Sequence, residues 1–261
     1  MTRPCSVLRV FTRGSAGGNH LGVVTDVAGL SAATMQQIAA ELGFSETVFI
    51  IPRQNQVPFA RIFTTQMEMP FAGHPLVGAA SMLLEQSNVD RLACGIGEVL
   101  IRQEGDVVWV DAPMYQRNAR IDPSGFASRV GLPEPVSTWR VEMPLDYRIV
   151  ELPVAEAVSK VAPDTTAFGD AHGLAVYARQ GDQVRMRFFI PEAGIEEDPA
   201  TGSAAVALAT RLAADGEPFG ALTIDQGEEI GHPSRIQLQW SGETASIGGT
   251  VATDQPLELS Y

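Results

Sequence analysis

The chain has 261 residues, of which 45% are hydrophobic and 19% charged, a composition typical of one large globular domain or two smaller ones. Its formal net charge is −13, with 18 Lys and Arg against 31 Asp and Glu. Nucleic acids and anionic membranes bind basic surfaces, so this balance of charge excludes both as expected partners. The expected ligand is a small molecule, which, if anionic, must bind where local positive charge outweighs the negative net charge.

The sequence contains no targeting segment or membrane span that its apolar pattern would reveal. The stretch MTRPCSVLRVFTRGSAGGNH contains no apolar segment of signal-peptide length, and no apolar run in the chain approaches the roughly 18 residues of a membrane span. We therefore expect a cytoplasmic protein without membrane contact. Cys5 and Cys94 lie far apart and lack a CxxC partner, so free thiols are expected.

Strands and one well-delimited helix are predicted along the first half. Residues 5–12 read as a strand, the Gly-rich segment 13–19 as a loop and 21–27 as a second apolar run. A helix is predicted over 32–42, with Ser31 as N-cap and Gly43 as its stop. Further strands are expected at 45–51 and 59–65, followed by a hairpin over 97–113 that turns at Gly105-Asp106.

The second half begins less clearly. Residues 113–163 are rich in proline and show little periodicity, so we place a crossover between domains near 113–120. Strands are predicted after it, at 173–179, 183–189, 221–227 and 234–240.

A short pattern occurs twice in the chain. The segments FAGHPLVGAA and EDPATGSAA both fit [H/D]-P-x-x-G-[A/S]-A when Pro75 is aligned with Pro199, and a strand precedes each. The repeat predicts two similar lobes. We place them at residues 1–117, with a central helix starting at Pro75, and 118–261, with a central helix starting at Pro199; the last strand is free to pack back on the N-terminal lobe.

Both central helices are apolar or small on nearly every face, which predicts helices wrapped by sheet. Proline is favourable at the first helical position, so His74 and Asp198 are expected at the two N-caps. Helix N-termini attract anions, and two of them facing each other would hold a carboxylate despite the negative net charge. His74 and Asp198 as purely structural residues remain an open alternative, since Asp is a preferred cap.

Other chemistries are less favoured by the same residues. Ser203 lacks the G-x-S-x-G context of a nucleophile, so a hydrogen-bonding or packing role is expected. A metal site formed by Glu46, His74 and Asp198 lacks paired histidine ligands at metal-binding spacing. Taken alone, Glu46 reads as a surface residue at the start of a strand.

Five blocks together carry a family resemblance: VFT…GGNHLGVV, LGFSETVFI, FAGHPLVGAA, EDPATGSA and QG…GHPSRIQL. In this order and over nearly the whole chain, they resemble the phenazine biosynthesis PhzF-like family. The resemblance implies an α+β fold related to diaminopimelate epimerase: two similar lobes, each a β-barrel-like sheet around a central buried helix, with the active site between them. It also implies an isomerase without metal or organic cofactor and, in common with family members, a homodimer.

The resemblance assigns roles to particular residues. Glu46 of SET matches the glutamate that acts as acid and base in moving a proton between carbons, and His74 and Asp198 match its polar partners. Contacts to a small carboxylate substrate are expected from Gly73, Gly202, Ser203 and Asn19. The paired-cysteine mechanism of diaminopimelate epimerases is disfavoured, because His74 and Asp198 occupy the positions where those cysteines would align.

Two positions depart from the family pattern. His20 follows Asn19 where proline is usual, and His232 follows Gly231 where arginine is common. If these loops line the cleft, the substrate differs from the phenazine precursor. A non-catalytic binder of a small anionic metabolite, using the same cleft, is the alternative function, and a Ser203 hydrolase is a weaker third.

Overall fold

The computed structural model describes residues 2–54, 56–86 and 89–260. Its helices are α1 (Ala32–Leu42), α2 (Gly73–Gln86), α3 (Pro123–Arg129), α4 (Ala155–Ser159) and α5 (Gly202–Ala214), with short 3₁₀ turns at η1 (Thr165–Ala167) and η2 (Pro191–Ala193). None of the helices within these ranges has both the length and the apolar character needed to cross a bilayer.

Strands dominate the fold. The first half contains β1 (Thr2–Thr12), β2 (Asn19–Val24), β3 (Glu46–Ile51), β4 (Phe59–Thr64), β5 (Glu68–Met69), β6 (Arg91–Cys94), β7 (Gly97–Glu104) and β8 (Val107–Pro113). The second contains β9 (Asn118–Arg120), β10 (Ser137–Glu142), β11 (Asp146–Glu151), β12 (Gly173–Gln180), β13 (Gln183–Ile190), β14 (Ile195–Asp198), β15 (Phe219–Gln226), β16 (Ser234–Ser241), β17 (Thr244–Thr253) and β18 (Leu257–Ser260). Few helices among many strands confirm the predicted α+β class.

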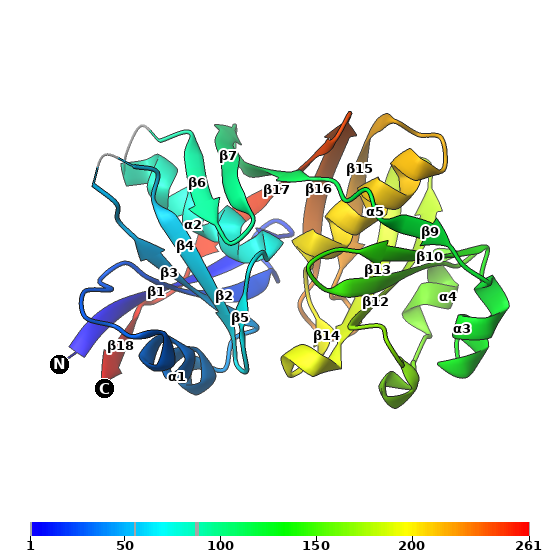
Figure 1. Cartoon of the computed structure of the whole chain (residues 1–261), viewed down its shortest axis with the longest axis horizontal. Helices are drawn as coiled ribbons and strands as arrows, with labels where there is room; N and C mark the ends of the chain where they lie inside the picture. The colour runs from blue at the N-terminus through cyan, green and yellow to red at the C-terminus, as the bar shows by residue number, and fades with distance from the viewer. Residues whose placement is uncertain (1, 55, 87–88, 261) are drawn as a thin grey trace.

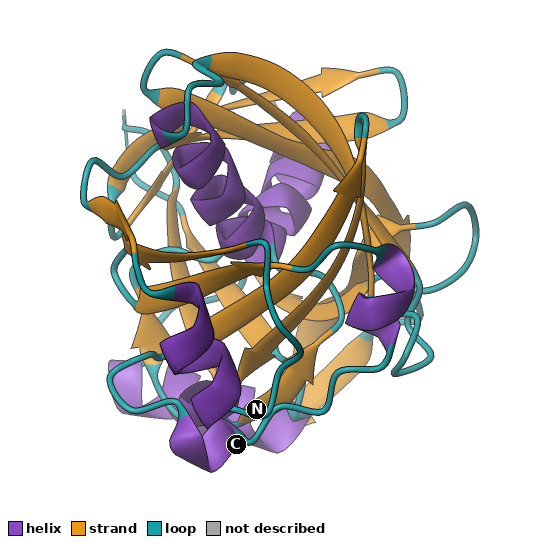
Figure 2. Ribbon diagram, turned by 90° about the vertical axis from the view of Figure 1, so that its right-hand side faces the viewer, coloured by secondary structure: helices purple, strands orange, loops and turns teal. Residues whose placement is uncertain are grey.

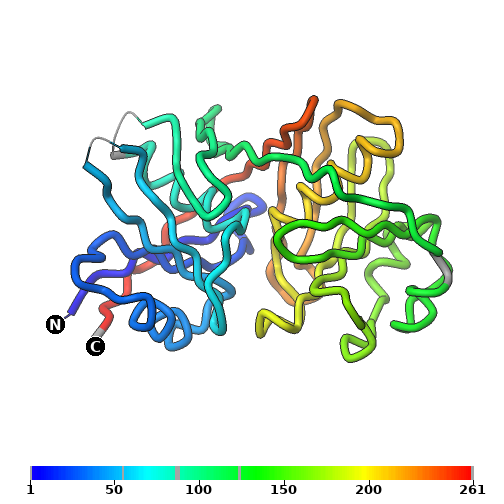
Figure 3. Tube along the Cα trace, in the orientation of Figure 1, coloured from blue at the N-terminus to red at the C-terminus, as the bar shows by residue number. Residues whose placement is uncertain are grey.

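Within the described ranges the strands form one connected, mixed sheet. Figure 1 shows it as two groups of strands side by side, one around α2 and the other around α5. Strand β17 joins them: it pairs with β16, with β8 and, in its last residues, with β1. The tube in Figure 3 follows this red segment from one group to the other.

The predicted helix over residues 32–42 is confirmed at both ends. The Ser31 hydroxyl accepts a hydrogen bond from the Thr34 backbone N–H at 3.1 Å. Gly43 adopts a φ of +67°, the left-handed conformation in which a Cβ is costly. This helix covers the outer face of β3 and β4 through a small apolar cluster that includes Met35, Ile38 and Phe63.

The two long helices are enclosed by strands, as Figure 2 shows. Residues Gly202 to Leu212 of α5 are all buried, and α2 contributes Leu76, Val77, Ala79 and Ala80 to the same core. Small and apolar residues on all faces are therefore required by the packing, as the sequence predicts. One hydrophobic core runs through both groups of strands.

The predicted helix starts were wrong. Helix α2 begins at Gly73, so His74 is its second residue rather than its N-cap; Pro75 still fits, because first-turn N–H groups lack helical partners. Asp198 ends strand β14, and α5 begins only at Gly202 with Thr201 as N-cap, because residues 199–201 are needed to turn from strand to helix. Aligning Pro75 with Pro199 therefore does not superpose equivalent helical positions.

Residues 113–163 contain elements that the sequence did not predict. Strands β9, β10 and β11 pair with one another there, and α3 and α4 pack nearby over a separate apolar cluster. The strands escaped detection because buried polar side chains interrupt their pattern; Arg148, for example, is buried against Asp146 and Asp170 at 2.6 Å each. The division at residues 117 and 118 stays a prediction, and β18 pairs with β1.

Cys5 and Cys94 are free and buried, as predicted. Burial raises the pKa of the Cys5 thiol to about 11 and also raises that of Cys94. Both are therefore protonated at neutral pH and serve as packing residues.

Candidate active site

The first residues of α2 and α5 meet at the centre of the molecule. A Cβ added to Gly73 would lie 2.5 Å from the Gly202 Cα, and one added to Gly202 would lie 2.7 Å from the Gly73 Cα. Ile247 of β17 closes the junction, 2.7 Å from either added atom. Only glycine at both positions permits this approach, which brings two sets of unpaired helical N–H groups together.

Asp198 lies beside this junction in a dense hydrogen-bond network. Its carboxylate accepts from the Asn19 Nδ2 at 2.8 Å and from the Thr201 hydroxyl at 2.5 Å. The nearby Ser45 side chain helps to lower the pKa of this carboxyl group. Gln226 supports the arrangement, donating to the Asp198 carbonyl at 2.7 Å and accepting from the Thr201 N–H at 3.2 Å.

His74 and Glu46 face each other across the same site. The His74 Nε2 lies 3.5 Å from the Glu46 Oε2, and neither atom has a hydrogen-bond partner although both are buried. The other ring nitrogen, Nδ1, lies 3.2 Å from the Asn19 Nδ2, which also reaches Asp198. Asn19 therefore links the two halves of the site, and the unpartnered pair presents polar atoms available to a ligand.

Burial controls the protonation of all three titratable groups. It raises the pKa of Glu46 well above its ordinary value, and the nearby Asp198 carboxylate raises it further. Burial raises the pKa of Asp198 to about 6 against the lowering effect of its hydrogen bonds, and it lowers the pKa of His74 to about 3. At neutral pH His74 is therefore neutral, and ionisation of the carboxyl pair favours the hydrogen-bonded Asp198 over Glu46.

Ser203, the second residue of α5, is buried and bonds to the Tyr147 hydroxyl at 3.2 Å. Burial raises the pKa of Tyr147, so this phenol is a hydrogen-bond partner and not a base. The arrangement fits the polar role expected of Ser203 and gives it no activating histidine of the kind a hydrolytic serine requires.

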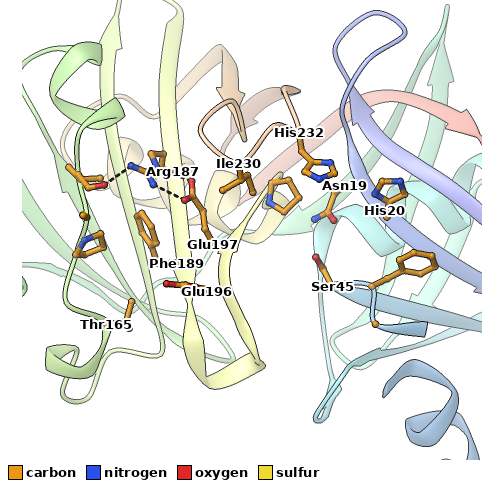
Figure 4. Close-up of a pocket in the computed structure, with 16 residues that line it drawn as sticks. Asn19, His20, Ser45, Thr165, Arg187, Phe189, Glu196, Glu197, Ile230 and His232 are labelled. Atoms are coloured by element: carbon orange, nitrogen blue, oxygen red, sulfur yellow. Dashed lines mark hydrogen bonds and ion pairs between the residues drawn. The ribbon is translucent and has the colours of Figure 1, made fainter. Parts of the chain in front are cut away.

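A cavity of about 700 Å³ opens beside this centre. Asn19, Ser45 and Pro199 line it, and the last two are the chain neighbours of Glu46 and Asp198. Figure 4 shows that Asn19, His20, Ser45 and His232 border one side and Arg187, Phe189, Glu196 and Glu197 the other. Both departures from the family pattern, His20 and His232, thus line the cleft.

The structure brings all seven candidate residues together, Asn19, Glu46, Gly73, His74, Asp198, Gly202 and Ser203. Sequence reasoning missed Thr201 and Gln226, which hold Asp198, and Tyr147, which holds Ser203. Thr201 had a signal, since it stands inside the recognised EDPATGSA block. Gln226 had the same kind of signal, since it stands in the recognised QG…GHPSRIQL block. Tyr147 had none, because only the folded strands bring it to the site. In the described ranges, no group of three or more His, Cys, Asp or Glu residues has the arrangement of a metal site.

Solved structures place this architecture in a known class, the fold shared by PhzF proteins and by proline racemases and epimerases. A PhzF-family protein from Bacillus anthracis has a TM-score of 0.83 at 20% identity, covering 100% of both chains. A hydroxyproline epimerase from Agrobacterium vitis has a TM-score of 0.66 at 13% identity, covering 99% of this chain and 92% of its own.

The sequence comparisons are more specific. The profile of the phenazine biosynthesis-like protein family (PhzC-PhzF) matches residues 8–253, and the chain belongs to this family. Trans-2,3-dihydro-3-hydroxyanthranilate isomerase of Pseudomonas aeruginosa is 37% identical over 256 residues, covering 90% of each chain. An isomerase of Mesorhizobium japonicum with no assigned reaction is 32% identical, covering 95% of each. The enzyme class is accordingly isomerase.

Proposed function

We propose that this isomerase moves a proton between carbons of a small cyclic or unsaturated carboxylic acid, with Glu46 as the general acid and base and with no cofactor. The observation that carries the proposal is the buried, unpartnered pair formed by the Glu46 Oε2 and the His74 Nε2, 3.5 Å apart. Such atoms have no structural use for their hydrogen-bonding capacity and are free to act on a bound molecule.

The electrostatics support the assignment of roles. Two buried carboxyl groups near each other do not both ionise readily, and the network around Asp198 holds the charge there. In its ionised form Glu46 removes a proton from one carbon, and the carboxylic acid so formed, whose pKa is raised by burial, delivers a proton to another carbon. The carbon–carbon double bond shifts as the proton moves, so the reaction consumes no other reagent. His74, uncharged at neutral pH, directs its unpartnered Nε2 toward Glu46 and is placed to hydrogen-bond a bound substrate.

The substrate carboxylate is proposed to bind where α2 and α5 begin. The close contact of Gly73 and Gly202 concentrates the N–H groups and positive dipole ends of two helices in one place. The Ser203 hydroxyl and the Asn19 amide add donors beside them. Each helix end contributes about 0.3–1 kcal/mol, and up to about 2 when partly buried, which favours an anion locally in an acidic protein.

The test is solvent deuterium incorporation. The protein is incubated in D₂O with trans-2,3-dihydro-3-hydroxyanthranilate and a panel of small unsaturated carboxylic acids, and products are read by mass spectrometry and proton NMR. We expect exchange into one compound with wild type and a loss of at least about 100-fold in Glu46→Gln, since acid–base catalysis contributes about 10²–10⁴ in rate. Glu41→Gln, which changes an exposed glutamate of α1, is the matched control.

The outcomes separate the two functions. Wild-type exchange in Glu46→Gln would refute the mechanism. Acids that bind tightly but exchange no proton with wild type favour the metabolite-binding alternative. A homodimer, implied by the family resemblance, and a cytoplasmic location, expected from the N-terminal sequence, are part of the proposal; light scattering of the purified protein tests the dimer.

A further inference from the structure

We propose that His20, Phe44 and His232 form an aromatic subsite at the mouth of the cavity, and that it selects acids whose remote end is a flat ring without negative charge. The inference rests on the proposed function, because it concerns the part of the substrate that lies beyond the reacting carbons. Nothing in the family match assigns these residues a role.

The first argument is geometric. The His20 and Phe44 rings stack with centroids 5.8 Å apart and planes at 12°, and the His232 ring meets His20 edge-on at 5.6 Å. All three line the cavity, and the His20 side chain keeps 36% of its surface exposed. Stacked and edge-to-face rings of this kind extend readily to a further ring, whose face or edge they attract.

The subsite is held rigidly by the loops that carry it. His20 follows the loop 13–18 and His232 belongs to the loop 227–233, and these loops touch: a Cβ on Gly17 would lie 1.8 Å from the Pro233 carbonyl oxygen. Arg13 pairs with Glu228 across the same contact. Because the two loops support each other, the two histidines are positioned before a ligand arrives, which lowers the entropic cost of binding.

The second argument is the charge of the walls. His20 presents a neutral ring at neutral pH, because burial and the nearby His232 and Arg9 lower its pKa against the opposing effect of Asp254. On the other side of the cavity, Arg187 is neutralised by a bidentate pair with Glu197 at 2.8 and 2.6 Å.

Glu196, which is exposed, adds a further carboxylate to that wall. Among the described residues that line the cavity, Arg187 is the only lysine or arginine and it is already paired, so the remote part of the cavity repels a second carboxylate. Phe189 and Ile230 supply apolar surface there. At about 700 Å³ the cavity lies within the range of sites for drug-sized ligands, larger than one small ring needs.

The test compares the binding of three probe acids by titration calorimetry: 2-naphthoate, cyclohexanecarboxylate and 2,6-naphthalenedicarboxylate. We expect wild type to bind 2-naphthoate most tightly of the three. His20→Ala should weaken 2-naphthoate binding by about three- to tenfold, the effect of one aromatic contact, and leave cyclohexanecarboxylate within about twofold. His20→Phe, which keeps a ring, should retain the preference. His172→Ala removes a histidine outside the cavity and is the matched control.

Several results would overturn the subsite: no measurable 2-naphthoate binding to wild type, equal binding of the dicarboxylate, or an effect of His20→Ala no larger than that of His172→Ala. The deuterium experiment is run in parallel with Glu46→Gln. Glu46-dependent exchange without a His20-dependent ring preference refutes the subsite alone. A His20-dependent ring preference without any Glu46-dependent exchange supports the subsite and refutes the isomerase mechanism.

Discussion

Gly73→Ala tests whether the contact between the two helix ends is required for the reaction. The added Cβ would lie 2.5 Å from the Gly202 Cα, 2.9 Å from the Gly202 carbonyl carbon and 2.7 Å from the Ile247 Cδ1. Two of these three atoms are backbone, so no rotamer change relieves the clash and the helix starts must move apart by roughly 1 Å to reach ordinary contact. Overpacking of this size costs about 1–3 kcal/mol.

Replacing a helical glycine by alanine returns up to about 1 kcal/mol, so we expect a net loss of about 1–2 kcal/mol in the free energy of unfolding, measured by urea denaturation. The effect on rate should be larger: a displacement of about 1 Å costs on the order of 100-fold when it misplaces reacting groups. The assay is the initial rate of deuterium incorporation, with substrate affinity measured separately.

Gly78→Ala, in the same helix, is the matched control. Its Cβ would meet only side-chain atoms, 2.4 Å from the Leu21 Cδ2 and 3.1 Å from the Val10 Cγ2, and these side chains can repack. We expect a comparable loss of stability with little loss of rate. Equal rates in wild type and Gly73→Ala, or equal rate losses in both variants, would refute the reasoning.

Three further predictions concern single groups. Burial raises the pKa of Asp198 from 3.8 to about 6, so between these pH values the native state binds more protons than the unfolded state. The free energy of unfolding therefore falls as the pH rises through this range. Asp198→Asn should reduce this fall, measured by urea unfolding at pH 4 and pH 7. Thr201→Val removes a hydrogen bond that lowers the pKa of Asp198, so the acidic limb of the exchange rate against pH should move to higher pH, and an unmoved limb contradicts the role of Asp198. Ser31→Ala removes the cap of α1 and should cost about 1 kcal/mol in urea unfolding without changing the exchange rate.

The sequence predicted best those features that short-range physics controls. The helix at residues 32–42 was predicted with both ends correct, because Ser31 and Gly43 fix them through hydrogen bonding and backbone conformation within one turn. The predicted start of α2 was wrong because proline tolerates several first-turn positions, and that of α5 was wrong because residues 199–201 turn from strand to helix. Each helix begins at a glycine, and these two glycines, Gly73 and Gly202, lie in close contact.

Strand β17 is an element that local sequence patterns do not predict. It was not predicted, since Gly248 and Gly249 weaken the strand pattern of its sequence. In the fold these glycines make room for rings: a Cβ at Gly248 would lie 2.5 Å from the Trp109 Cδ2, and one at Gly249 would lie 2.5 Å from the Phe11 Cδ1. Glycine is therefore required at these two positions by contacts with residues that are distant in the sequence.

The residues of the candidate site also differ in how far the sequence predicted them. Glu46 carries no local signal and was identified through the family resemblance, whereas His74 and Asp198 stood out as polar residues at the heads of apolar helices. Tyr147 was missed because it comes from strand β11, whose sequence contains nothing unusual at that position. Gln226, at the end of β15, stands in the recognised QG…GHPSRIQL block, but only the fold shows that it supports Asp198.

The pairing of β1 with β17 and β18 has a consequence for biosynthesis. Residues 2–5 pair with 257–260, and Leu8 pairs with Thr253. A ribosome adding about 5–20 residues per second takes roughly 10–50 s to make the chain between these partners. Throughout that time one edge of β1 has open hydrogen-bonding groups, and such edges invite pairing with other chains. The N-terminal half of the molecule therefore completes its fold only once β17 and β18 have been made, and a nascent chain arrested before Thr244 exposes an edge on which chaperones or aggregation act.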